Sequence, residues 1–213
     1  MNPSMKTAFD RRGFLGVGIA TTAALWQSTA ASQPAGGLTA LQKRLPITCR
    51  HEGVWDGIYR RYDASGRPLG EHRSRVVIRL REDPAGGNEL LQQSNYYFHP
   101  DGRREAIDTL GRFDGERLNF YSDRVDGWTM DDATDPKRAT VILAMSFKKD
   151  VGWYTKGVDV YELINIAADD RFRSRMAQHL KDGQALTRTL INERLRTRDW
   201  RSVADWQSVP FED

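Results

Sequence analysis

Turn-forming residues recur at short intervals along most of this 213-residue chain and divide it into brief segments. Clear examples are the turns at 63–66, 101–102, 114–115 and 182–183, where Asp is combined with Gly or Ser. These residues stabilise tight turns, either through side-chain hydrogen bonds to the backbone or through backbone freedom. Short connections join neighbouring antiparallel strands, whereas parallel strands need long crossovers. The chain is therefore expected to fold as sequential antiparallel strands.

The segments between the turns alternate in polarity, as strands with two different faces do. Within 73–82, Ser74, Val76, Ile78 and Leu80 lie on one face, and arginines occupy the other. About ten strands are predicted in this way, at residues 53–62, 73–82, 89–99, 103–112, 116–123, 126–132, 138–147, 153–167, 171–181 and 184–198. Closing such a sheet on itself removes its exposed edges. The predicted fold class is all-β, an up-and-down antiparallel barrel of about ten strands.

Two shorter segments flank the predicted barrel. Leu38, Leu41 and Leu45 have helical spacing, and Pro46 follows them. Because proline cannot continue a helix, we predict a short N-terminal helix over 38–45. The C-terminal tail carries Trp200 and Trp206, and it is expected to pack against the barrel or to plug one of its ends.

The N-terminus resembles a bacterial twin-arginine export signal. Arg11 and Arg12 precede an apolar run, residues 14–26, that is short and rich in Gly, Ala and Thr. A stable membrane span needs about 20 strongly apolar residues, so no such span is expected. We predict a signal peptide at 1–31, a linker with the short helix at 32–50, and the barrel with its tail at 51–213. Export through the twin-arginine (Tat) translocase would place the mature protein in the periplasm or outside the cell.

The charge balance argues against a nucleic-acid partner. The chain has a net charge of +3, of which Lys6, Arg11 and Arg12 against Asp10 supply +2, leaving about +1 after residue 31. Nucleic-acid binding depends on a basic excess. Residues 171–201 are locally basic, however, with nine Lys or Arg against three Asp or Glu. Cys49 is the single cysteine and is expected to be a buried or half-buried small side chain.

Residues 53–63, which read GVWDGIYRRYD, resemble the first strand of the calycin-type barrels. That superfamily includes lipocalins, fatty-acid-binding proteins and phycobiliprotein lyases. The chain is more similar to a group of bacterial lipocalin-like proteins, the DUF3598-like group, and the supporting stretches are 72–75, 93–97, 100–103, 161–164 and 188–194. The resemblance implies a barrel that holds a small organic molecule, on which some relatives act as chaperones or catalysts. The lipocalin Thr-Asp-Tyr motif and a bilin-handling motif are not evident.

Several polar side chains fall at spacings that could line a barrel cavity. Gln93, Asn95 and Tyr97 share one strand face, and Arg173 and Arg175 share another. An inward arginine could bind a carboxylate or enolate bidentately. The candidate ligand-binding residues are Gln93, Asn95, Tyr97, Tyr161, Arg173, Arg175 and Arg188. The alternative is that the arginines face solvent, with Phe172, Met176 and Leu180 forming the core face.

Glu162 and Glu193 are the candidate catalytic residues, because each stands between apolar residues of a predicted strand. A buried carboxylate has a raised pKa unless it is paired, and such groups can serve as general bases. The alternative is a structural ion pair with an arginine of a neighbouring strand. Strand aromatics, including Trp55, Tyr59 and Tyr154, could line a ligand pocket or simply fill the core.

No motif indicates a cofactor or a metal. The four histidines, His51, His72, His99 and His179, lack metal-ligand spacing, and His72 and His99 are expected to be exposed. Asp131, Asp132 and Asp135 are interpreted as a solvated acidic turn rather than a calcium site. A phosphate loop, a dinucleotide fingerprint and a serine-hydrolase elbow are all missing from the sequence.

These features favour an exported barrel that binds a small hydrophobic molecule, which could also carry negative charge. Two alternatives stay open. One is a cofactor-free isomerase, cyclase or lyase that uses Glu162 or Glu193 as its base, with an arginine or Tyr97 stabilising an oxyanion. The other is an interaction protein of the cell envelope that uses an outer face of the barrel.

Overall fold

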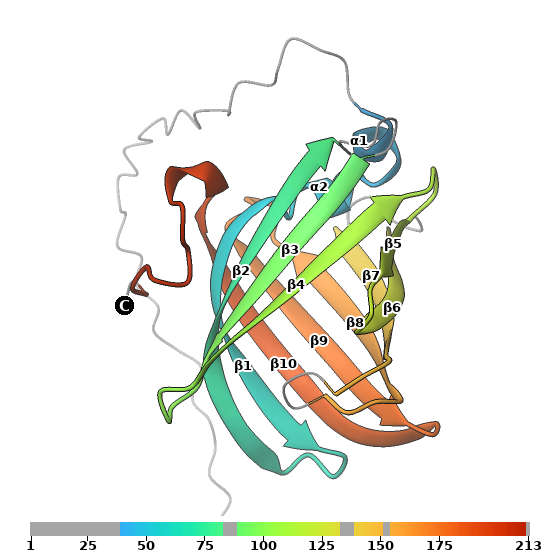
Figure 1. The fold of residues 1–213 in the computed structure, drawn as a ribbon, viewed down its shortest axis with the longest axis vertical. Coiled ribbons are helices and arrows are strands. Elements are labelled where there is room, and N and C mark those ends of the chain that lie inside the picture. Colours follow the sequence, from blue (N-terminus) through green and yellow to red (C-terminus); the bar gives the residue numbers. More distant parts are fainter. Residues whose placement is uncertain (1–38, 83–88, 133–138, 151–153, 212–213) are drawn as a thin grey trace, which may run out of the picture. The chain divides into compact units, whose positions relative to one another are not determined.

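The computed structural model describes residues 39–82, 89–132, 139–150 and 154–211, and the predicted signal peptide lies outside them. Ten antiparallel strands close into an up-and-down barrel in which each strand pairs with its sequence neighbours and β10 pairs with β1 (Figure 1). The predicted fold class is therefore confirmed. The strands are β1 (Gly53–Asp63), β2 (Pro68–Glu82), β3 (Glu89–Phe98), β4 (Arg104–Phe113), β5 (Leu118–Tyr121), β6 (Val125–Asp131), β7 (Thr140–Phe147), β8 (Val158–Ile166), β9 (Phe172–Lys181) and β10 (Gln184–Thr197).

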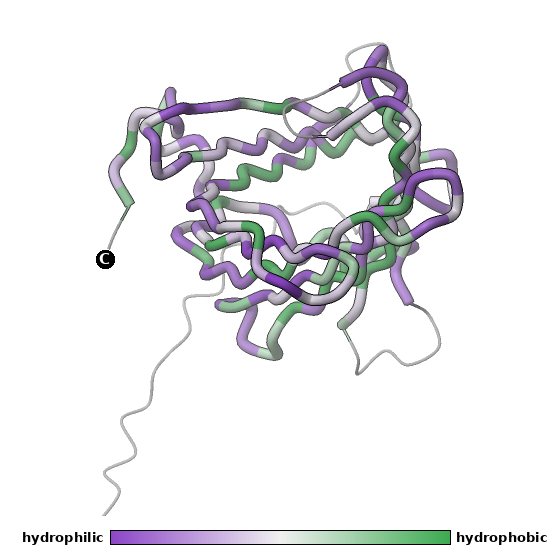
Figure 2. The backbone as a smooth tube through the Cα atoms, turned by 90° about the horizontal axis from the view of Figure 1, so that it is seen from below, coloured by the Kyte–Doolittle hydropathy of each residue, from purple (hydrophilic) through white to green (hydrophobic). Residues whose placement is uncertain are grey.

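Hydrophobic and hydrophilic residues alternate along the strands (Figure 2), as expected where successive side chains point to opposite faces of a sheet. On β2, Ser74, Val76 and Ile78 point inward, as the sequence pattern predicts. On β9 Arg173 and Arg175 are buried while Phe172 and Met176 are about half exposed, so the alternative in which the arginines face solvent is wrong. The register of a closed barrel fixes which face is inside, and here it turns the basic face of β9 inward.

Two one-turn helices close one end of the barrel. Helix α1 (Ala40–Arg44) is capped by Thr39, and α2 (Pro46–Cys49) follows directly. Pro46 ends the first helix as predicted, but it also begins the second, since its fixed φ suits the first position of a helix. Leu41, Leu45 and Ile47 pack onto barrel residues such as Trp55, and Cys49 packs beside them. These helices, rather than the C-terminal tail, form the plug.

Asp131 anchors the plug. Its carboxylate accepts hydrogen bonds from the backbone N–H groups of Ile47 at 2.6 Å and Thr48 at 2.8 Å, and from the Thr48 hydroxyl at 2.6 Å. The carboxylate is therefore a buried cap on the N-terminus of α2, and the prediction that Asp131 belongs to a solvated turn is wrong. Burial raises the pKa of Asp131, and the three donors oppose that shift.

Replacing Asp131 with Ala should loosen the plug, because it leaves two buried N–H groups without their acceptor. We expect a loss of about 1–3 kcal/mol in the free energy of unfolding, measured by urea denaturation. Asp126→Ala on the same strand removes only an exposed pair with Lys148 and should cost less than about 1 kcal/mol. Equal losses in the two variants would contradict the anchoring role of Asp131.

The C-terminal tail packs on the outside of the barrel. Trp206 is buried against Val54 and Val77, and Trp200 begins the 3-10 helix η2 (Trp200–Ser202) beside it. Arg75 points outward but is fully buried, because its guanidinium donates to the carbonyls of Trp206 at 2.8 Å and Val209 at 2.6 Å. Arg75 also pairs with Asp56. Of the two predicted placements of the tail, packing against the barrel is the correct one.

Candidate functional site

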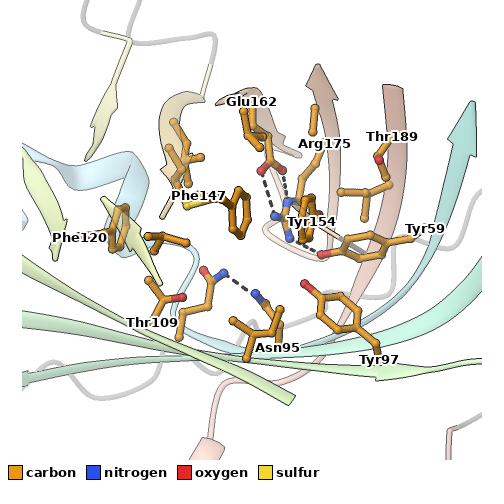
Figure 3. A pocket seen from close by; sticks show the side chains of 18 residues that line it. Tyr59, Asn95, Tyr97, Thr109, Phe120, Phe147, Tyr154, Glu162, Arg175 and Thr189 are labelled. Atoms are coloured by element: carbon orange, nitrogen blue, oxygen red, sulfur yellow. Dashed lines mark hydrogen bonds and ion pairs between the residues drawn. The ribbon is translucent and has the colours of Figure 1, made fainter. Parts of the chain in front are cut away.

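The middle of the barrel contains a cavity of about 60 Å³ (Figure 3). Its wall combines aromatic, aliphatic and polar side chains from most of the strands. The residues that line it include Tyr59, Gln93, Asn95, Tyr97, Phe147, Tyr154, Glu162, Arg175, Ala177 and Thr189. Small-molecule pockets have this composition, an apolar wall with a few placed polar groups.

Aromatic rings form one part of the cavity wall (Figure 3). Tyr59 and Tyr97 meet edge to face with ring centroids 5.6 Å apart, and Phe147 stacks on Tyr154 at 4.4 Å with an interplanar angle of 7°. Rings in these arrangements give a rigid wall that favours contact with another flat molecule. Burial raises the pKa values of Tyr59 and Tyr97 well above the usual value for tyrosine, so the hydroxyl groups of these two residues stay protonated near neutral pH.

Charged side chains form the part of the cavity wall beside Tyr59. Both Nε and Nη2 of Arg175 donate to Glu162, the second at 3.1 Å, and Nη1 donates to the Tyr59 hydroxyl at 2.9 Å. Nη1 also lies 3.4 Å from Glu193. The guanidinium thus has a bidentate carboxylate partner and further acceptors, and its charge is balanced within the wall.

A second buried ion pair lies between this wall and the plug. Arg173 pairs with Glu193, and its guanidinium stacks 4.5 Å from the Trp55 ring. Gly57 stands opposite Glu193 on β1. A Cβ at Gly57 would come within 2.5 Å of the Asn192 carbonyl, so only glycine allows β1 and β10 to lie this close together here. Together Arg173, Arg175, Glu162 and Glu193 form an electrically neutral group, which we call the charge quartet.

The charge quartet limits the acid–base chemistry of Glu162 and Glu193. Burial raises the pKa of Glu193, but the charges of Arg173 and Arg175 outweigh burial and hold it below its usual value. Glu193 therefore stays ionised near neutrality, and its lowered pKa makes it a weak general base. Glu162 reaches the cavity, yet both of its oxygens accept from Arg175. The geometry favours the ion-pair alternative over the catalytic one.

The predicted ligand-binding residues separate into two groups. Gln93, Asn95, Tyr97 and Arg175 line the cavity, and Arg173 is buried behind it. Tyr161 is 56% exposed, and Arg188 is exposed and donates to Gln178. Both lie on the outer face because they alternate with inward residues, Tyr161 with Glu162 and Arg188 with Thr189. The structure does not bring them to the cavity.

Three of the four histidines, His51, His72 and His179, are buried, so the expectation that His72 is exposed is wrong, and His99 is half-buried rather than exposed. His72 is 6% exposed, and its ring lies 5.2 Å from that of His99 and 5.1 Å from that of Tyr59. Burial, with the charges of His99 and Arg61 adding to it, lowers the pKa of His72 to about 4. Burial also lowers the pKa of His51 and of His179. Within the described ranges, no His, Cys, Asp and Glu side chains gather as a metal site would require.

These histidines make the fold sensitive to acid. An unfolded histidine titrates near pH 6.5, whereas His72 stays neutral in the folded protein down to about pH 4. The unfolded state therefore binds more protons between these values, and stability falls as the pH is lowered from 6.5 towards 4. Urea denaturation should show that the free energy of unfolding is lower at pH 4.5 than at pH 6.5. In the His72→Gln variant this difference should be smaller by about 2 kcal/mol. An identical pH dependence in the variant would contradict the buried, neutral state of His72.

Fold and site together define a closed antiparallel up-and-down barrel with a partly polar internal cavity, and none of its described helices is long and apolar enough to cross a membrane. No family model and no curated protein sequence matches the chain. Solved structures resemble it, two of them at sequence identities of 12% and 19%, at which the resemblance shows the fold alone.

The first structure is a protein of unknown function from the DUF3598 family of Nostoc punctiforme, with a TM-score of 0.43, 19% identity, and coverage of 70% of this chain and 48% of that chain. This chain thus spans about half the length of that protein. The second is the S-type phycobiliprotein lyase CpeS from Guillardia theta, with a TM-score of 0.51, 12% identity, and coverage of 71% of this chain and 92% of that chain.

Proposed function

We propose that the barrel binds a small, mainly hydrophobic molecule with a planar ring in its internal cavity. The observation that carries the proposal is a buried hydrogen-bonding group of the cavity wall that has no partner within the described part of the chain. The Thr189 hydroxyl is 2% exposed, lines the cavity and has no hydrogen-bond partner within the described part of the chain. Buried polar groups are normally paired, so a ligand or water is expected to satisfy this one.

The size of the cavity sets the mode of entry. At about 60 Å³ it is smaller than the roughly 150 Å³ that admits benzene in an engineered cavity. A ring can enter only if a wall residue moves, and Tyr154 is the candidate because its flat contact with Phe147 is the contact a planar ligand would make. We propose that the ligand replaces Tyr154 against Phe147. The similarity in fold to a protein named as an S-type phycobiliprotein lyase is compatible with this class of ligand.

Fluorescence titration with the neutral probe N-phenyl-1-naphthylamine tests the proposal. Ala177 lines the cavity, so Ala177→Phe should fill it and weaken binding at least about tenfold, the equivalent of 1.4 kcal/mol. Tyr154→Ala should tighten binding by enlarging the cavity. Ala144→Phe, on the outer face of β7, is the matched control and should leave affinity unchanged. Absence of binding, or equal affinity in the Ala177→Phe variant, would overturn the proposal.

We also propose that residues 1–31 direct export through the Tat translocase, so that the mature protein works in the periplasm or outside the cell. The support is the sequence alone, Arg11 and Arg12 before a short apolar run. Replacing both arginines with lysine should retain the full-length protein in the cytoplasm, which fractionation and immunoblotting would detect. Unchanged export of that variant would exclude this route.

An interaction at the outer face is the second candidate function. Leu163, Met176 and Leu190 lie opposite one another on β8, β9 and β10 and are each 40–47% exposed. Neighbouring exposed apolar side chains mark interaction surfaces. If this row binds another protein chain, Met176→Glu should abolish the complex in size-exclusion chromatography while leaving binding of the probe intact.

A further inference from the structure

The charged side chains of the cavity wall are already balanced by one another. Among the described residues that line the cavity, only Glu162 and Arg175 carry a charge. Arg175 donates to both oxygens of Glu162, and its Nη1 donates to the Tyr59 hydroxyl and lies 3.4 Å from Glu193. A buried charge without a counter-charge is costly. A charged group on a ligand is therefore disfavoured in this cavity, whichever its sign.

The polar groups that the wall offers to a ligand are uncharged, and two of them belong to β3. The side-chain amine of Gln93 donates to the side-chain oxygen of Asn95 at 3.2 Å. This bond leaves the Gln93 oxygen as an acceptor and the Asn95 amine as a donor, and neither has another partner within the described part of the chain. If both amides were turned over, one acceptor and one donor would still remain. We call Gln93 and Asn95 the amide pair.

Hydroxyl groups lie on two sides of the cavity. Thr109 on β4 stands opposite Gln93 in the β3–β4 register and lines the cavity beside the amide pair. Thr189 belongs to β10, which β1 and β2 separate from β3 in the barrel, and it lies on the other side of the cavity (Figure 3). A ring held between β3 and β10 would thus meet hydrogen-bonding groups at two opposite edges.

Resting on the proposed function, we infer that the ligand is an uncharged ring with hydroxyl groups on opposite edges, one bonded to the amide pair and the other to Thr189. A hydroxyl group both donates and accepts, so a single hydroxyl can satisfy the acceptor of Gln93 and the donor of Asn95 together. A carboxylate or a ketone only accepts and would leave the Gln93 oxygen without a donor. At the other edge, a second hydroxyl would supply the partner that the buried Thr189 hydroxyl lacks within the described residues.

Displacement of bound N-phenyl-1-naphthylamine by three naphthalenes tests this inference, because the series keeps the ring and changes only its substituents. We expect 2,6-dihydroxynaphthalene to bind at least about tenfold more tightly than naphthalene, since a site built to bond a hydroxyl discriminates against the analogue that lacks it. The doubly charged naphthalene-2,6-dicarboxylate should bind more weakly than naphthalene at neutral pH, because the cavity offers its charges no free counter-charge.

Variants assign the preference for the diol to the two edges of the cavity. Gln93→Leu and Thr189→Val nearly keep the side-chain volume and remove one hydrogen-bonding group each. Each should lower the ratio of diol to naphthalene affinity by about threefold and leave the affinity for naphthalene unchanged. Gln92→Leu is the matched control, because Gln92 alternates with Gln93 and lies on the outer face of β3. Binding of N-phenyl-1-naphthylamine to every variant verifies that the barrel has folded.

The outcomes separate this inference from the proposed function. Equal binding of the diol and naphthalene, or tighter binding of the dicarboxylate than of the diol, would overturn the uncharged, hydroxyl-bearing ligand and leave the cavity proposal standing. A preference for the diol that neither Gln93→Leu nor Thr189→Val lowers would also overturn it. Failure of the unmodified protein to bind N-phenyl-1-naphthylamine would overturn the cavity proposal itself.

Discussion

Glu193→Ala should lower the free energy of unfolding by about 3–5 kcal/mol, because it removes one partner of a fully buried ion pair. The Glu193 side chain has no exposed surface, and that of Arg173 has 2%. Without the carboxylate, the charge of Arg173 faces only the Trp55 ring and His51, whose Nδ1 lies 3.4 Å from Nη1. Neither can compensate a buried guanidinium, and Arg175 retains Glu162 as its own partner.

Two further variants separate charge from packing at this position. Glu193→Gln keeps the volume and one acceptor oxygen, so it should cost less than Glu193→Ala. Arg173→Met combined with Glu193→Leu removes both charges, and such replacements are often neutral or stabilising. Urea denaturation should therefore find the double variant more stable than Glu193→Ala. A cost below about 1 kcal/mol for Glu193→Ala would show that the charge quartet does not stabilise the fold.

Trp55→Ala should cost a similar 3–5 kcal/mol, the range for a large aromatic removed from a core. Trp55 is fully buried and lies where the plug meets the barrel. Its indole N–H donates to the His51 carbonyl at 2.9 Å, and its ring faces Arg173. The substitution thus removes core packing, a buried hydrogen bond and the stacking surface of a buried cation at the same time.

Trp128→Ala is the matched control for that measurement. Trp128 lies on the outer face of β6, where the Arg117 guanidinium stacks on it at 5.6 Å. We expect it to cost about 1 kcal/mol or less, as solvent-exposed cation–π contacts do. The comparison can be made by thermal unfolding of the Trp55→Ala and Trp128→Ala variants. Similar unfolding midpoints would contradict the placement of Trp55 at the junction of plug and barrel.

The strands were predictable because turn chemistry and alternation are local properties. The predicted segments 53–62, 73–82 and 89–99 agree with the observed strands β1, β2 and β3 at three of their six ends, differ by one residue at two, and differ by five at the start of β2. Closure followed from the number of strands and the absence of long connections. The position of the plug could not be predicted from local sequence. It depends on hydrogen bonds from α2 to Asp131, which lies more than eighty residues away in sequence.

The inward face of β9 could not be predicted from its own residues. In isolation, Phe172 and Met176 look like a core face, and the opposite arginines look solvated. Arg175 can be buried because it forms an ion pair with Glu162 on β8. Arg173 can be buried because it forms an ion pair with Glu193 on β10. Burial of charge depends on partners across strands, which only the register reveals. His72, by contrast, had a usable signal, because it shares the face of Ser74, Val76 and Ile78, which the sequence already marked as one side of β2.

The measurement that tests the central claim most directly is an NMR titration of the isotopically labelled protein with N-phenyl-1-naphthylamine. We predict that the perturbed side-chain methyl resonances belong to strand residues that line the cavity, including Val160, Ala177 and Ile191. The resonances of the outer row, Leu163, Met176 and Leu190, should remain in place. Perturbations confined to that outer row, or none at saturating probe, would contradict a ligand-binding cavity inside the barrel.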